Sequence, residues 1–68
     1  MEKTDAEKLI GAFALAISAN MPEDLAERIA TNLDQLAREM LRHEGRTRTQ
    51  TLCTDLAATI RAAHPASH

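Results

Sequence analysis

The side chains best suited to chemistry in this sequence are three histidines and one cysteine. His43, His64, His68 and Cys53 are residue types that bind zinc, and a zinc site needs about four such ligands converging at a recognisable spacing. His64 and His68 could share a helix face, but Pro65 between them interrupts the helix that would align them. We therefore expect no metal site and no cofactor, with Cys53 acting as a small hydrophobic residue.

A catalytic group of residues is also missing from the pattern. Glu23 forms close carboxylate pairs with Asp24 and Glu27, but acid–base catalysis needs a carboxylate that is removed from water. These three residues fall in the first turn and on the polar side of a predicted helix, where they stay solvated. Ser18 has no base at a suitable spacing, and two glycines are too few for a phosphate-binding loop. The sequence predicts that the protein is not an enzyme.

A cluster of arginines is the strongest candidate for binding a partner. Lysines and acids give residues 1–27 a negative charge, whereas residues 28–68 carry six arginines and four acids, although the chain as a whole has a charge of −2. Arginine makes two-pronged contacts with carboxylates and phosphates. An acidic protein surface, a nucleic acid and plain solvation all remain open as its environment. The predicted partner-binding residues are Arg38, Arg42, Arg46 and Arg48.

Three helices must position these residues. The chain has no Val, Trp or Tyr, and strands draw heavily on such residues, so we expect an all-α fold. Thr4 with Glu7 matches a helix capping box, Gly45 is a natural helix stop, and Pro65 ends the last helix. The helices are predicted at about residues 5–20, 22–43 and 48–64, followed by a loose tail at 65–68.

Apolar residues recur at helical spacing in each segment. The second helix presents a seam of Ala26, Ile29, Leu33, Leu36 and Met40, with Asp34 and Arg38 spaced for an ion pair on its polar side. The third presents Leu52, Leu56, Ile60 and Ala63. Because the joints between helices are short, neighbouring helices should be antiparallel. The sequence predicts a small up-down-up bundle, or a helical hairpin with a third helix.

The first helix is apolar on every side. Between Leu9 and Ala19 the only residues that are not large apolar residues or alanine are Gly11 and Ser18. A helix that is apolar all round is normally buried all round, and two companion helices cannot surround a third. We therefore expect a second copy of the chain, or a different protein, to cover part of it. The predicted oligomer interface comprises Ile10, Phe13, Leu15, Ala16, Ile17 and Ala19.

The length of 68 residues also favours self-association. One domain of this size builds only a small core, and a single cysteine offers no disulfide to support it. Association into a homodimer or larger homo-oligomer is the remaining means of stabilisation. The longest apolar stretch is too short to span a bilayer, and no targeting segment is visible. We expect a cytoplasmic protein without a membrane partner.

A function follows from these features only in outline. A short, alanine-rich helical chain without catalytic residues is similar to the accessory and inhibitor proteins of phages and plasmids. The sequence favours a non-enzymatic, homo-oligomeric protein-interaction module that binds and blocks another macromolecule as a regulator or inhibitor. A small nucleic-acid-binding regulator that uses the Arg38–Arg48 cluster is the alternative. A weaker one is an oligomer that sequesters a small ligand between its subunits.

Overall fold

A computed structural model of the chain describes residues 3–64, which form three α-helices and, within that range, no strand. The helices are α1 (Asp5–Ser18), α2 (Glu23–Glu44) and α3 (Arg48–Ala63). The predicted all-α, three-helix fold is therefore confirmed. The tail at 65–68, predicted to be loose, lies outside the described residues, as do residues 1 and 2.

Local hydrogen bonds account for where α1 and α3 begin. The hydroxyl of Thr4 accepts from the Glu7 backbone N–H at 3.1 Å, and the Glu7 carboxylate accepts from the Thr4 N–H at 3.0 Å, which confirms the predicted capping box. Thr47 caps α3 in the same way, accepting from the Gln50 N–H at 3.1 Å. Both starts are thus set by residues within one turn of sequence.

The helix ends follow equally local rules. α1 ends at Ser18, two residues before the predicted end. The N–H groups of Asn20 and Met21 then donate to the carbonyls three residues back, those of Ile17 and Ser18, which tightens the last turn. The Asn20 side-chain amide also donates to the Ala16 carbonyl at 3.0 Å. Gly45 ends α2 with a φ of 78°, a backbone conformation that glycine adopts without a steric penalty.

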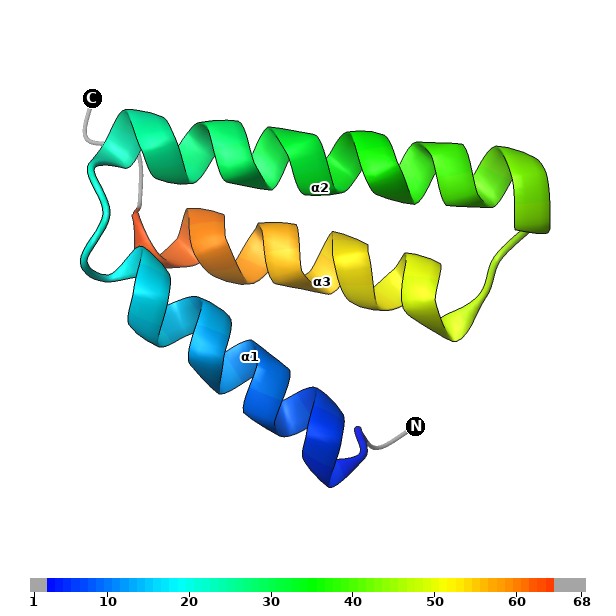
Figure 1. Ribbon diagram of the computed structural model, residues 1–68, viewed down its shortest axis with the longest axis horizontal. Coiled ribbons are helices and arrows are strands. Elements are labelled where there is room, and N and C mark those ends of the chain that lie inside the picture. The colour runs from blue at the N-terminus through cyan, green and yellow to red at the C-terminus, as the bar shows by residue number, and fades with distance from the viewer. Residues whose placement is uncertain (1–2, 65–68) are drawn as a thin grey trace.

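The helices form a hairpin with a third helix beside it (Figure 1). α2 and α3 run antiparallel and side by side, whereas α1 diverges from them at an angle. α1 packs against α3 rather than along α2, so that α3 is the central helix of the three. Of the two arrangements that the short joints allow, the structure has the hairpin with a third helix.

The core is built mainly from alanine. Ala26 and Ala30 of α2 meet Ala57 and Ile60 of α3, and all four are buried. Small side chains let two helices approach closely, so the alanines of α2 form the buried part of its contact with α3, and Ile29 and Leu33 pack against the edge of this core. The predicted seam of α2 is wrong at Leu36, which is 52% exposed.

Within the described residues, no helix is both long enough and apolar enough to cross a membrane.

Candidate interaction surfaces

α1 faces α3 with three small side chains and one carboxylate. Glu7, Gly11, Ala14 and Ser18 lie on one side of the helix and are its least exposed residues, with Ser18 fully buried. A Cβ atom added to Gly11 would meet no atom within 4 Å, so the contact is not tight at that point. α1 is therefore attached to the hairpin through a narrow and shallow contact.

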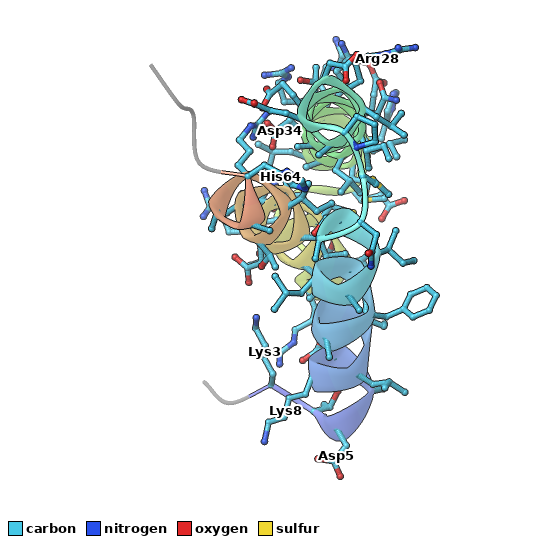
Figure 2. All side chains as sticks on the ribbon, turned by 90° about the vertical axis from the view of Figure 1, so that its left-hand side faces the viewer. Lys3, Asp5, Lys8, Arg28, Asp34 and His64 are labelled. Atoms are coloured by element: carbon cyan, nitrogen blue, oxygen red, sulfur yellow. The ribbon has the colours of Figure 1, made fainter. Side chains whose placement is uncertain are left out.

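The large side chains of α1 lie on the surface instead. Leu9 is 70% exposed and Phe13 65%, and Ile10 and Ile17 are 44% and 40% exposed. Helical spacing places these four residues on one side of α1, which we call the apolar face. In Figure 2, α3 lies to one side of both α1 and α2, and α1 carries side chains on its other side that no helix covers.

The six residues predicted as one interface do not share one side of the helix. Ile10, Phe13 and Ile17 belong to the apolar face, and Ala16 lies at its edge. Leu15, which is 48% exposed, points in nearly the opposite direction from Phe13, since two residues along a helix turn it by about 200°. All six residues are exposed.

An ion pair joins α1 to α3 near the start of both helices. Arg48 donates to the two carboxylate oxygens of Glu7, from Nε at 2.7 Å and from a terminal nitrogen at 2.5 Å. These hydrogen bonds, with a further one from the Thr4 backbone, lower the pKa of Glu7 to about 2. Because such a two-pronged contact restricts orientation, it holds the Glu7 side of α1 toward α3.

A hydrogen bond to α3 holds the other end of α1. The Nε2–H of His64, at the end of α3, donates to the Ser18 carbonyl oxygen. The Ser18 hydroxyl donates in turn to the Leu15 carbonyl at 3.1 Å. With a polar contact at each end, α1 cannot turn its large apolar residues toward α3 without breaking one of them.

The structure disperses the predicted arginine cluster. Arg48 is engaged with Glu7 across two helices, and Arg42 pairs with Glu39 one turn away on α2. Arg38 and Arg46 make no ion pair with any of the residues 3–64. Three exposed arginines on α2 and the joint that follows it form what we call the arginine surface: Arg38, Arg42 and Arg46.

A hollow beside the arginine surface is shallow. Its lining includes Leu36, Leu41 and Arg38, and every lining residue belongs to α2. A single helix is convex and cannot enclose a small ligand, so this hollow does not have the form of a ligand pocket.

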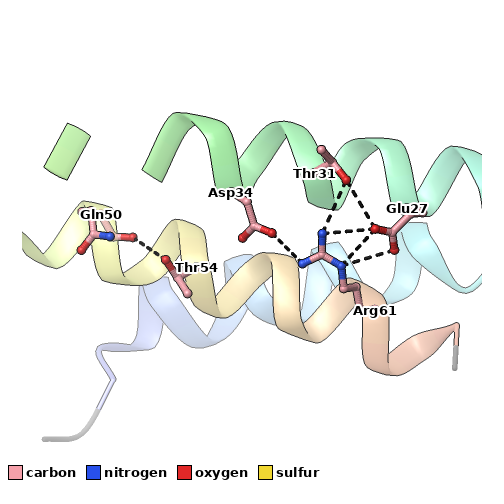
Figure 3. A network of polar contacts seen from close by, with 6 residues as sticks. All are labelled: Glu27, Thr31, Asp34, Gln50, Thr54 and Arg61. Atoms are coloured by element: carbon pink, nitrogen blue, oxygen red, sulfur yellow. Dashed lines mark hydrogen bonds and ion pairs between the residues drawn. The ribbon is translucent and has the colours of Figure 1, made fainter. Parts of the chain in front are cut away.

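A polar network that sequence reasoning missed joins α2 to α3 (Figure 3). Arg61 of α3 donates to Asp34 at 2.7 Å and to both carboxylate oxygens of Glu27 at 3.2–3.3 Å. Asp34 was predicted to pair with Arg38 on its own helix, and that prediction is wrong. Local spacing indicated Arg38, whereas the pairing with Arg61 depends on the alignment of the two helices.

The described residues hold no group of side chains that could bind a metal ion. Across residues 3–64, no three His, Cys, Asp or Glu side chains gather closely enough to hold a metal ion. Cys53 is a free thiol, half-buried on α3. The two surfaces described above, one apolar and one basic, are the candidates for binding a partner.

Comparisons with protein-family models, with curated proteins and with solved structures give no match to this chain.

Proposed function

We propose that the protein is a non-catalytic interaction module that works as an assembly of identical copies joined through the apolar face of α1. One observation carries the proposal: α1 packs mainly through small residues and leaves Leu9 and Phe13 about two-thirds exposed. A continuous exposed apolar patch on a small domain is typical of a protein-binding site.

The ties at the two ends of α1 support this reading. If α1 were free to rotate, its large residues could turn inward and enlarge a core that now consists mainly of alanine. Glu7 with Arg48, and His64 with the Ser18 carbonyl, hold it in the opposite orientation. These polar contacts thus keep the apolar face exposed in the single chain. This is what we expect if the face is covered by a second copy in the assembly.

The arginine surface supplies the second half of the proposal. Arg38 and Arg42 lie on α2, away from the contact of α1 with α3, whereas Arg46 lines a hollow beside that contact, together with Glu7 and Arg48. Self-association through the apolar face therefore leaves Arg38 and Arg42 accessible. Arg38 and Arg46 have no carboxylate among residues 3–64 to neutralise them. Their chemistry fits an acidic surface on another protein, which the assembly would bind and block. Repetition of the surface in each copy would strengthen such binding.

Light scattering after size-exclusion chromatography tests self-association. The wild type should have a mass of at least two chains at 50 µM, about fifty times a micromolar dissociation constant. Phe13→Asp places a charge in the covered face and should give monomers, whereas Leu15→Asp, on the other side of α1, should assemble normally. A wild type that stays monomeric, with a cooperative thermal transition, would refute the proposal.

A further inference from the structure

The apolar face of α1 has a size pattern that selects one way of pairing. Phe13 stands at its centre, with Leu9 four residues before it and Ile17 four residues after it. The half before Phe13 carries two large residues, Leu9 and Ile10, whereas the half after it carries the large Ile17 and the small Ala16. The face is therefore bulkier at one end than at the other.

We infer that two copies of the chain pair α1 against α1 in antiparallel fashion, about a two-fold axis that passes beside Phe13. This inference rests on the proposed function and specifies its partner and geometry. In such a pair the bulky half of each face meets the thinner half of the other. Leu9 lies against Ala16 of the second copy, Ile10 against Ile17, and Phe13 against its own counterpart.

Parallel pairing fits the same residues less well. It would crowd Leu9 and Ile10 of both copies at one end and leave Ala16 opposite Ala16 at the other, which opens a gap between the helices. A two-fold, self-complementary interface is also the commonest form of homodimer. The antiparallel arrangement uses the observed side-chain sizes without such a gap.

Charge does not oppose this pairing. No ionisable residue occurs between Leu9 and Ala19, so no like charges meet across the central part of the interface. Lys8 is on the far side of α1 from Phe13, as helical spacing requires. The exposed alanines Ala12 and Ala16 border the face and allow the two helices to approach to the short end of the usual 8–10 Å.

The surrounding elements leave room for a second copy. α3 contacts the opposite side of α1, and α1 diverges from α2 along its length (Figures 1 and 2). A second α1 can therefore lie along the apolar face without first displacing another helix of the same chain.

The exposed area suits a weak but specific dimer. With about 200 Å² for a fully exposed large apolar side chain, the four residues of the apolar face leave about 450 Å² open on each copy. Two such faces with their bordering alanines reach about 1,000 Å², the least that a specific interface usually buries. The pair should consequently dissociate in the micromolar range.

Disulfide trapping tests the register. The test uses the double variant Leu9→Cys with Ala16→Cys in a Cys53→Ser background. The two thiols cannot form a disulfide within one chain, because seven helical residues separate their Cα atoms by about 10 Å. Across the antiparallel pair, each thiol meets the other thiol of the second copy. Mild oxidation at 100 µM, about a hundred times a micromolar dissociation constant, should therefore give a covalent dimer on a non-reducing gel.

The single variants provide the controls. Leu9→Cys alone and Ala16→Cys alone should remain monomeric on the gel, because each thiol lies about 9–12 Å along the helix from its own counterpart. Leu15→Cys, on the other side of α1, reports the background of random collisions. A covalent dimer from Leu9→Cys alone would indicate parallel pairing and overturn the inference.

Two further outcomes separate the register from the proposed function. If the double variant fails to cross-link although light scattering shows two chains, the register is wrong and self-association stands. If the protein is monomeric under the same conditions, the inference and the proposed function fail together.

Discussion

Replacing Phe13 with alanine should dissociate the assembly while leaving the fold of each chain unchanged. Phe13 is 65% exposed in the single chain, so with about 200 Å² for the whole side chain it offers about 130 Å² to a second copy. Since the two chains are identical, the substitution removes buried side-chain area from both copies of the pair. Because alanine retains about a third of it, the pair loses about 170 Å², worth about 4 kcal/mol at about 25 cal/mol per Å².

A loss of about 4 kcal/mol corresponds to a dissociation constant roughly a thousand times larger. Sedimentation equilibrium over a range of concentrations measures both constants, and circular dichroism checks that helicity is retained. Leu15→Ala is the matched control, since it removes a 48% exposed leucine from the other side of α1. If Phe13→Ala associates within threefold of the wild type, or if Leu15→Ala is equally damaging, the reasoning is refuted.

Four further predictions concern the single chain and the arginine surface. The pKa of Glu7 is lowered from 4.5 to about 2, so its contribution to stability is complete above pH 4.5 and is lost as the pH falls toward 2. The melting temperature of Glu7→Gln should therefore vary less with pH over this window than the melting temperature of the wild type. Gly11→Ala should raise the free energy of unfolding by about 0.5–1 kcal/mol, because the added methyl group meets nothing within 4 Å, whereas Gly45→Ala should lower it by a similar amount because of the positive φ. Arg61→Met should lower the melting temperature by about 5 °C, the value expected for losing an exposed ion-pair network. Random duplex DNA should show no salt-dependent mobility shift with the wild type, and steeply salt-dependent binding would instead favour a nucleic-acid partner for the arginine surface.

The features that local chemistry determines were predictable from the sequence. Thr4 with Glu7 and the glycine at 45 mark helix ends because their hydrogen bonds and backbone angles involve only residues within one turn. The absence of Val, Trp and Tyr correctly indicated an all-α chain. Short joints left two arrangements open, because periodicity does not determine the angle at which a third helix crosses a hairpin.

The orientation of each helix was less predictable, because it depends on residues far apart in the chain. Glu7 and Arg48 are 41 residues apart, and their contact decides which side of α1 faces α3. Asp34 could pair with Arg38 by local spacing, yet it binds Arg61, which is 27 residues away. Leu36 shares a helical stripe with Ile29 and Leu33, which pack against the core, yet Leu36 is exposed.

The most direct test of the central claim, that a second copy covers the apolar face of α1, is an isotope-filtered nuclear Overhauser experiment on a mixture of labelled and unlabelled chains. Phe13 is the only Phe, and the chain has no Trp or Tyr, so its ring protons are readily identified. The account predicts contacts between chains from the Phe13 ring to the second copy's Phe13 ring and Ile17 methyl groups, at concentrations of several hundred µM, well above a micromolar dissociation constant. A complete absence of such contacts, with Phe13 ring shifts that do not change on dilution, would contradict it.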